Sequence, residues 1–488
     1  MGLSNQRIDE DQFLASRQEV LNMYKTGAQV NLEEAIAYCK AIPAHKNLTH
    51  QLREARKNET VIMHNLSGMA TIEMHRNLLS ALQDQGGAGL LHCIYDSLTR
   101  TCRFDESERL MKESEKTGKN MLNGFPVVAY GVKGCRELFE SLDRPISALG
   151  PSIDSRLCTE IAMASGFSEL VLNTFTAFET YTKTVPLEEI IGYHQYAARL
   201  ASYYQDHGID ICCVVPNGPG GDNAPGIAPP SLGTAGNILG ALMCAGQGLK
   251  YLVFDYHSHG NLAQDAASCF VRLKLAKEYL EKLGYHDIEC YLENGQLGGQ
   301  YPQNFDQARI QVAYGASISA VTNAEVCQVK TYDESSNIPT LESQVSSLIM
   351  GKMMYDIIKT QHIDFRNMKE IQIEMEEEEK ETRAIVDKVL ELGDGDPMVG
   401  SVKAYELGVL DNPVASNPRV AMKTVGIKDL NGAVRYLNTG NLPFTQEMKD
   451  FHLDRLNARA EKLGHKLDFD TLVADMRAIA AGEWISKK

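Results

Sequence analysis

AEVCQVKTYDESSNIP, residues Ala324–Pro339, is the stretch around which the rest of the chain is organised. A short apolar run, Val326–Val329, ends at Lys330, and Glu334 follows one loop later. A buried strand that ends at a cation, with a carboxylate just beyond it, is how barrel enzymes present polar groups at the open end of their sheet. On this stretch alone, a surface lysine and glutamate beside an edge strand fit equally well, so the neighbouring stretches decide.

The composition is that of a globular protein with a large core. The chain has 488 residues, of which 43% are hydrophobic and 23% charged. Its net charge of −16 and pI near 5.3 argue against a nucleic-acid partner. No apolar run approaches the roughly 20 residues of a membrane span, and the first residues lack the apolar core of a signal peptide.

The 11 cysteines are scattered and include no C-x-x-C pair, which is typical of a reducing compartment. No zinc, haem or iron–sulfur pattern is present. We therefore expect a cytoplasmic protein with no membrane contact and no metal ligand set.

From Thr60 onward, short apolar runs alternate with helical stretches. This alternation predicts a parallel sheet covered on both faces. Eight or nine such units in about 300 residues favour a (β/α)8 barrel over an open sheet. One run is surplus, and Ile146–Leu149 is the weakest. The runs are Val61–His64, Gly89–Ile94, Phe125–Tyr130, Ile146–Leu149, Leu170–Phe175, Ile211–Val215, Tyr251–Asp255, Ile288–Leu292 and Val326–Lys330.

The two ends of the chain differ from this central pattern. Residues 1–58 are polar with helical spacing, and we expect them to pack outside the barrel of residues 59–362. Residues 363–488 read as a helical and α+β appendage. Its first helix, Met368–Leu392, contains Glu376–Glu379, a run of four acids that predicts a solvated helix face.

Polar residues and glycines follow several of the runs. In a barrel the carboxyl ends of the strands meet at one mouth, so we expect these loops to surround a ligand site. They are Asn65–Gly68, the segment with Asp96, Thr99 and Arg100, Asn123-Gly124, and the glycine-rich stretch Asn294–Pro302.

Asp255–Gly260, DYHSHG, matches D-x-H-x-x-G, the pattern in which a histidine ligates the cobalt of cobalamin. The modules that use this pattern are separate doubly wound domains. Here the hexapeptide lies within the barrel repeat, which leaves no room for a second fold. A barrel loop is therefore the favoured interpretation.

Several motifs resemble the large (epsilon) subunit of glutamate mutase, also called methylaspartate mutase, almost from end to end. They are EKTGKNMLNGFPVVAYGVKGC (Glu115–Cys135), Asp154-Ser155-Arg156, Pro229-Pro230-Ser231, Val329-Lys330-Thr331 with Glu334 and Ile338-Pro339, Gly400–Ala404, and Val434–Leu437 with Gly440-Asn441. The resemblance implies a (β/α)8 barrel that caps cobalamin carried by a small partner subunit, which holds the D-x-H-x-x-G motif in that family. It also implies a dimer of this chain within a heterotetramer, and a radical rearrangement that uses adenosylcobalamin.

By matching position, the resemblance implies a set of cofactor-contacting residues. Lys330 and Glu334 would meet the adenosine end, where ribose hydroxyls need donors and acceptors. Thr180 and Tyr301 depart from the family's proline and phenylalanine. The full set is Gly68, Asn123, Thr180, Tyr301, Lys330, Glu334 and Ile338.

The substrate positions depart from the family pattern. The family grips a dicarboxylate with three arginines, and of these only Arg100 remains, in Leu98-Thr99-Arg100. The other two positions hold Leu66 and Leu149, and the glutamate that takes the substrate amine is replaced by Val171. An acidic position falls at about Val214, a tyrosine is replaced by Ala177, and Tyr181 is retained. These changes predict an apolar pocket, and a carboxylate buried there without its partner would cost about 3–5 kcal/mol.

Three hypotheses follow, and the catalytic residue is unknown in each. In the first, the chain is the large subunit of a mutase whose substrate keeps one anion for Arg100 and presents an apolar remainder, with Glu169 or Glu179 as a displaced base. In the second, it is a true glutamate mutase whose grip is rebuilt from Arg103, Arg144 or Arg156. In the third, it is a non-catalytic barrel that binds the cobalamin subunit.

Overall fold

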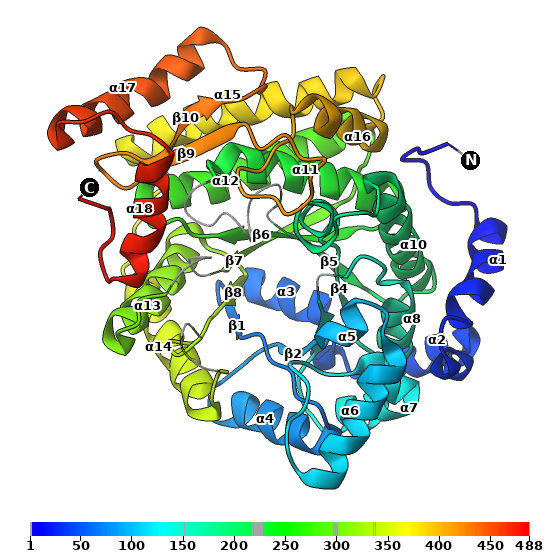
Figure 1. Ribbon diagram of the computed structural model, residues 1–488. Coiled ribbons are helices and arrows are strands. Elements are labelled where there is room, and N and C mark those ends of the chain that lie inside the picture. The colour runs from blue at the N-terminus through cyan, green and yellow to red at the C-terminus, as the bar shows by residue number, and fades with distance from the viewer. Residues whose placement is uncertain are drawn as a thin grey trace.

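The chain forms an eight-stranded parallel barrel surrounded by helices (Figure 1). This computed structural model describes residues 2–150, 152–216, 218, 228–295, 301–334, 336 and 338–487. Part of the predicted glycine-rich loop, residues 296–300, lies outside that range. Strand order around the sheet is β1-β8-β7-β6-β5-β4-β3-β2. The strands are β1 Ile62–His64, β2 Leu91–Ile94, β3 Ile146–Leu149, β4 Glu169–Val171, β5 Cys212–Val215, β6 Tyr251–His257, β7 Glu289–Gly295 and β8 Val326–Gln328.

Two backbone hydrogen bonds close the seam between β1 and β2. Gly89 N donates to Met63 O at 2.8 Å, and Ile94 N donates to Ser67 O at 2.9 Å. Each strand is followed by helix on the outside, as the alternating pattern requires. The predicted (β/α)8 barrel is therefore confirmed.

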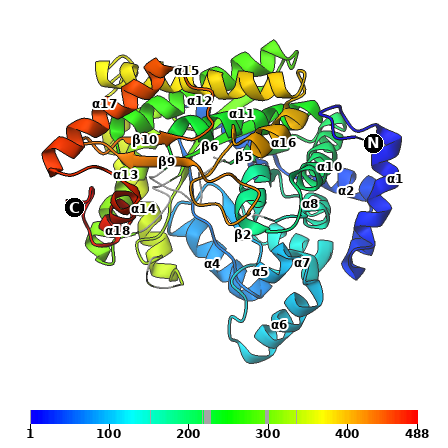
Figure 2. The ribbon, with the colours of Figure 1, turned by 45° about the horizontal axis from the view of Figure 1, so that its top comes forward.

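Helices cover the outside of the barrel and extend beyond it at both ends of the chain (Figures 1 and 2). Around the barrel lie α4 Ile72–Asp84, α5 Ser97–Arg100, α6 Phe104–Thr117, α7 Val127–Glu140, α8 Arg156–Ala164, α9 Thr174–Thr176 with the π-helical turn Ala177–Tyr181, α10 Leu187–Asp206, α11 Pro230–Gly246, α12 Leu262–Lys282, α13 Phe305–Thr322 and α14 Leu341–Lys359. Before them come α1 Glu10–Leu21, α2 Leu32–Lys40 and α3 Leu48–Lys57, and after them α15 Lys369–Leu392, α16 Pro397–Leu407, β9 Thr424–Lys428, β10 Val434–Thr439, α17 Gln446–Leu463 and α18 Phe469–Ala480.

The surplus apolar run is Phe125–Tyr130, so the prediction that it would be Ile146–Leu149 is wrong. Ile146–Leu149 is β3 and pairs with β2 along its whole length. Phe125 only bridges the end of β2, where its amide donates to Ile94 O at 2.6 Å, and α7 begins after Pro126. An unbroken apolar run does not distinguish a strand from the first turns of a buried helix.

Helix α3 closes the bottom of the barrel, and the prediction that residues 1–58 pack outside the core is wrong for this helix. In Figure 1 it lies across the centre of the barrel. Its Leu48 and Leu52 are fully buried against a cluster of inward-facing strand residues, and its arginines bind the strand starts. Arg53 pairs with Asp210 (2.8 Å) and Glu289 (2.9 Å), and Arg56 with Glu325 (2.7 Å). The inward-facing strand residues are Ile62, Leu90, Cys212, Val214, Val253, Tyr291 and Val326.

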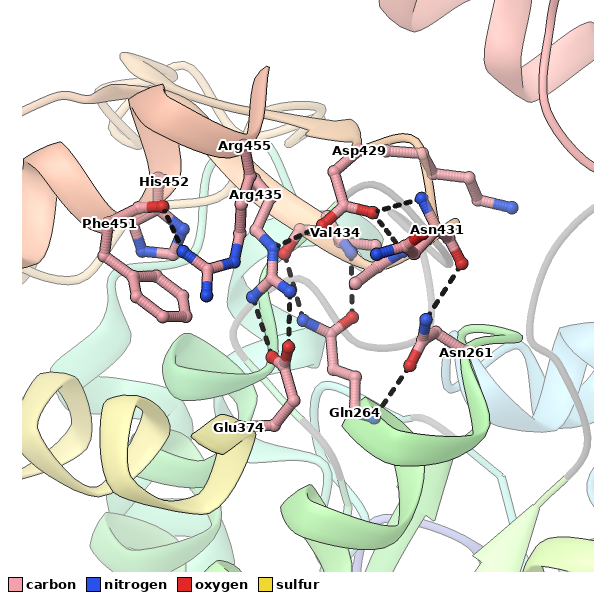
Figure 3. Close-up of polar contacts among 12 residues, drawn as sticks. Asn261, Gln264, Glu374, Asp429, Asn431, Val434, Arg435, Phe451, His452 and Arg455 are labelled. Carbon is pink, nitrogen blue, oxygen red and sulfur yellow. Dashed lines mark hydrogen bonds and ion pairs between the residues drawn. The ribbon is translucent and has the colours of Figure 1, made fainter. Parts of the chain in front are cut away.

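The C-terminal region packs on the side of the barrel formed by α11 and α12 (Figure 2). The side-chain amide of Gln264 on α12 bonds both the carbonyl (3.0 Å) and the amide (2.8 Å) of Val434, as a neighbouring strand would (Figure 3). Next to it, Arg435 bonds Asp429 on one side and both carboxylate oxygens of Glu374 on the other (Figure 3). The hairpin of β9 and β10 is thus held to α12 and α15.

The acidic run of α15 does not form a solvated face, so that prediction is wrong for half of it. Glu377 and Glu378 are buried because α15 lies against α11 and α12. Glu378 accepts hydrogen bonds from Thr234 (2.7 Å) and Ser268 (2.5 Å), and burial raises its pKa to about 7. Within the described residues, no helix is both long and apolar enough to cross a membrane.

The position of α3 can be tested by truncating a leucine. Leu52→Ala should lower the free energy of unfolding by about 2–5 kcal/mol, because it leaves a cavity beneath the barrel. Leu407→Ala, at a mostly exposed leucine of α16, should change it by less than about 0.5 kcal/mol. Urea unfolding followed by circular dichroism measures both, and equal losses would contradict a plug at Leu52.

Candidate active site

A cavity of about 320 Å³ opens at the carboxyl ends of the barrel strands, where a barrel places its ligand site. This inner cavity brings together five of the six predicted substrate-contacting residues, namely Leu66, Arg100, Leu149, Val171 and Tyr181. Ala177 is fully buried in the π-helical turn, and the described lining does not include it.

Arg100 supplies a cation to the inner cavity. Helix α5 positions it, with Asp96 capping the amides of Leu98 and Thr99, and the Arg100 Nε donates to Tyr95 O at 2.7 Å. No carboxylate in the described chain lies within ion-pair distance of its guanidinium. The phenol of Tyr181 and the carboxylate of Asp96 favour its charge, whereas burial lowers its pKa. A half-buried guanidinium of this kind is suited to bind one anion.

The three arginines considered for a rebuilt grip lie elsewhere. Arg103 pairs with Glu106 at the surface, Arg156 pairs with Asp154 at 2.8 Å, and Arg144 is exposed. In the described lining, only Arg100 and Lys330 carry a fixed positive charge, and Lys330 is already paired with Glu334 at 3.0 Å.

The inner cavity is not apolar throughout, and the prediction of an apolar pocket is wrong for its deeper half. Near the mouth, an apolar collar is formed by Leu66, Ile94, Leu149 and Val171. Below the collar lies a polar floor, which the sequence analysis missed apart from Glu169 and Asp255–His257. The floor consists of His92, Glu169, Asp255, Glu293 and Gln328, with His257 beside it.

The floor follows from the two-residue period of the strands. Successive inward residues are Leu90 just before β2, then His92 and Ile94 within it, and Tyr291 then Glu293 along β7. Glu169 lies two residues before Val171 in the same way. This alternation is the signal that would have found the floor, but it is hidden in runs that read as simply apolar.

Burial makes the carboxyl groups of the floor weak acids. Burial and the nearby charge of Glu293 raise the pKa of Glu169 to about 8, and burial raises that of Glu293 to about 7. Glu293 bonds the Nε2 of His64 at 2.9 Å, and burial lowers the pKa of this imidazole to about 4. Glu169 is only 4% exposed, and its Oε2 has no hydrogen-bond partner among the described residues. Perturbed carboxyls that face a cavity are typical of a functional site.

The other candidate base, Glu179, does not belong to this site. It is fully buried, and its carboxylate accepts hydrogen bonds from Tyr405 and Asn412, both at 2.9 Å. Its backbone carbonyl accepts from the amides of Ser416 and Asn417. Glu179 therefore attaches the C-terminal region to the loop after β4, and of these two candidate bases only Glu169 is among the described lining residues of the cavity.

A second cavity of about 380 Å³, the side cavity, shares Leu66, Ile94 and Lys330 with the inner one. Five of the seven predicted cofactor-contacting residues line it, namely Gly68, Asn123, Lys330, Glu334 and Ile338. Thr180 and Tyr301 are absent from its described lining. Thr180 is half-buried on the π-helical turn, and Tyr301 is buried. Ile338 is 78% exposed at the rim, as an apolar contact for a large ligand would be.

The side cavity also contains polar atoms that lack partners. Asn65 Oδ1, Thr331 Oγ1 and Gln344 Oε1 are buried and make no hydrogen bond within the described chain. Two amide acceptors and a hydroxyl suit a ligand that carries hydroxyl or amino groups. At Gly68 a Cβ would lie 2.7 Å from Gly124 Cα and from Ile94 O, so this loop can approach its neighbours only with glycine.

Asp255–Gly260 forms the end of β6 and the turn into α12. Asp255 and His257 lie 3.4 Å apart (Oδ2 to Nε2) and line the inner cavity, while Gly260 has a φ of +98° beneath Trp484. The hexapeptide is thus part of the barrel wall, in agreement with the favoured interpretation.

Comparison with known proteins relates the whole chain to one family. The sequence model of the family described as methylaspartate mutase E chain (MutE) matches residues 42–488. The glutamate mutase epsilon subunit of Treponema denticola is 34% identical over 487 residues, covering 100% of this chain and 99% of the relative. The proteins of the same name from Desulfitobacterium hafniense (34% over 487 residues, 100% and 99% covered) and Escherichia coli O157:H7 (33% over 488 residues, 100% of both) are similarly related.

The raised pKa of Glu169 makes stability depend on pH. In the folded chain the carboxyl keeps its proton up to about pH 8, whereas unfolded it ionises near its ordinary 4.5. Raising the pH between these values therefore destabilises the wild type, and Glu169→Gln removes this loss. At about pH 9 the free energy of unfolding of the variant should exceed that of the wild type by at least about 1 kcal/mol, and near pH 5 the two should differ little.

Urea unfolding across this pH range measures the effect. Glu188→Gln, which changes an exposed carboxylate of α10, is the matched control and should follow the wild type at every pH. A Glu169→Gln variant that is no more stable than wild type at high pH would contradict a buried, protonated Glu169.

Proposed function

Because the chain belongs to the methylaspartate mutase E chain family, we propose that it is the large subunit of an adenosylcobalamin-dependent carbon-skeleton mutase whose substrate is not glutamate. The change of substrate rests on one observation. Among the described lining residues of the inner cavity, Arg100 is the one arginine, and its guanidinium forms no ion pair with a described carboxylate. Glutamate would bring a second carboxylate against the apolar collar or the acidic floor. Neither offers it a cation, and burying an unpaired carboxylate costs about 3–5 kcal/mol.

The side cavity fits the adenosyl end of the cofactor. The orphan atoms of Asn65, Thr331 and Gln344 match ribose hydroxyls and an adenine amino group, and the ion pair of Lys330 with Glu334 adds a charged donor and acceptor. When bound, adenosylcobalamin supplies the radical that starts a rearrangement of this kind. Lys330 lines both cavities, so it would meet cofactor and substrate together.

The chain's own residues would hold the substrate and exclude water. Arg100 would bind the carboxylate at the mouth, with the phenol of Tyr181, 42% exposed, beside it. The collar would surround the apolar part, where a radical must be kept from solvent and from other reactants. Glu169 would take or give a proton at the floor, because its pKa of about 8 lies near neutral pH.

The proposal includes a partner and a location. Cobalamin would be held mainly by a separate small subunit, since Asp255 and His257 are part of the barrel wall. Two copies of each subunit would make a heterotetramer. All 11 cysteines are free thiols, which suits the cytoplasm.

Two alternatives have less support. A true glutamate mutase needs further cations in the cavity, and Arg103, Arg144 and Arg156 lie outside the described lining. A non-catalytic barrel would have no need of a cavity with a cation at one end and perturbed carboxyls at the other.

Electron paramagnetic resonance on the reconstituted enzyme tests the proposal. The full chain is mixed with its small subunit and adenosylcobalamin, and then with glutamate or with amino and hydroxy acids that carry one carboxylate and a larger remainder. We expect a substrate-dependent radical signal with one of the latter and none with glutamate. Arg100→Met should abolish the signal, because the substrate carboxylate loses its partner, and Arg103→Met should preserve it.

Each outcome has a distinct meaning. A radical signal with glutamate would show that glutamate is a substrate and would contradict the proposed change of substrate. Silence with every acid, although the cofactor binds, would favour the non-catalytic barrel.

A further inference from the structure

The inner cavity has opposite electrical character at its two ends. Arg100 stands at the mouth, and the carboxyls of Glu169 and Glu293 lie at the floor. The collar lies between them, because Leu149 and Val171 each follow a floor-level residue, Ser147 and Glu169, by two positions on the same strand. Two strand residues separate these levels by about 6.7 Å.

None of the described residues of the floor is a lysine or an arginine. Among the described residues, no lysine or arginine pairs with Glu169 or Glu293, and the Oε2 of Glu169 has no hydrogen-bond partner. Glu169 is nevertheless nine-tenths buried and faces the cavity. Two nearby buried carboxyls repel each other when ionised, as the effect of Glu293 on the pKa of Glu169 indicates. A cation placed between them would relieve this repulsion and fill the missing hydrogen bond.

We propose that the inner cavity binds an amino acid whose ammonium group is separated from its carboxylate by a methylene chain, with the ammonium on Glu169 and Glu293 and the carboxylate on Arg100. The inference rests on the proposed function, since it names the substrate class of the same site. It accounts for all three levels: the anion at the guanidinium, the methylenes in the collar and the cation at the floor. Because the collar stands about 6.7 Å above the floor, a chain of at least about four methylenes is needed to carry the carboxylate past the collar toward Arg100.

The alternative is that the floor carboxyls stay protonated and the ligand carries no charge at that end. The two cases predict different effects of a ligand amino group on affinity. With an ammonium site, removing the amino group from the ligand must weaken binding; with protonated carboxyls alone, removing it must strengthen binding, because an ammonium is costly to desolvate.

Isothermal titration calorimetry on the full chain tests this directly. The probe is 5-aminopentanoate, and its matched controls are pentanoate, which lacks the cation, and glutarate, in which a carboxylate replaces the ammonium end. We expect 5-aminopentanoate to bind at least about tenfold more tightly than either control. Within the series from 3-aminopropanoate to 6-aminohexanoate, affinity should peak where the chain spans collar and floor.

Variants assign the two ends. Glu169→Gln should weaken 5-aminopentanoate by about tenfold or more and leave pentanoate unchanged, whereas Arg100→Met should weaken both. Glu188→Gln, the surface control, should change neither. The ligand comparison on the wild-type chain stands even if a variant does not fold.

Several results would overturn the inference: pentanoate or glutarate binding as tightly as 5-aminopentanoate, an unaltered preference in Glu169→Gln, or no binding by any member of the series. These experiments need neither the small subunit nor the cofactor, so the two proposals fail separately. Binding of 5-aminopentanoate with no radical signal from any acid would refute the mutase and keep the cation site. A radical signal only with acids that lack an amino group at the far end of the chain would do the reverse.

Discussion

The strict alternation of side chains along eight parallel strands is the constraint on which this molecule depends. Every second residue points into a lumen too narrow for bulk water, so each level of the lumen must be filled or satisfied by the protein. Apolar residues and α3 fill the lowest level, carboxyls and imidazoles occupy the middle one, and the collar surrounds the mouth. The backbone bonds of Met63 and Ser67 across the seam hold these levels in register.

The middle level is unfavourable for folding taken alone. Burial keeps the Glu169 and Glu293 carboxyls weakly acidic and the His64 imidazole neutral, and Ser147 and His64 only partly offset the desolvation. A barrel built only for stability would continue the apolar packing upward from Tyr291 and Val326. The chain nevertheless keeps this polar level below the collar, in a cavity whose mouth holds the Arg100 guanidinium, and perturbed carboxyls that face a cavity are typical of a functional site.

The fold was largely predictable because it rests on local signals. Short apolar runs marked all eight strands of the barrel. The errors have tertiary causes. Phe125–Tyr130 is apolar because it starts a buried helix, and Glu377 and Glu378 are buried because α15 packs on two other helices.

The candidate site was predictable in part. Polar residues at strand ends predicted the mouth, and matching positions placed most of the expected residues on two adjoining cavities. His92 and Glu293 of the floor were missed because each follows apolar residues of its strand, and only the direction of the side chain separates an inward polar residue from an outward one. The sequence also could not show which of Glu169 and Glu179 faces the cavity. They lie ten residues apart, but Glu169 lines the cavity and Glu179 contacts the C-terminal region.

The π-helical turn Ala177–Tyr181 connects the appended region with the cavity wall. On one side it presents Tyr181 to the ligand space, and on the other Glu179 is held by Tyr405 and Asn412. The C-terminal region therefore supports the cavity wall, and a displacement of this region would be transmitted to the wall through this single π-helical turn. Substitutions in the C-terminal region, which adds no strand to the barrel, would therefore act on the cavity wall through this turn.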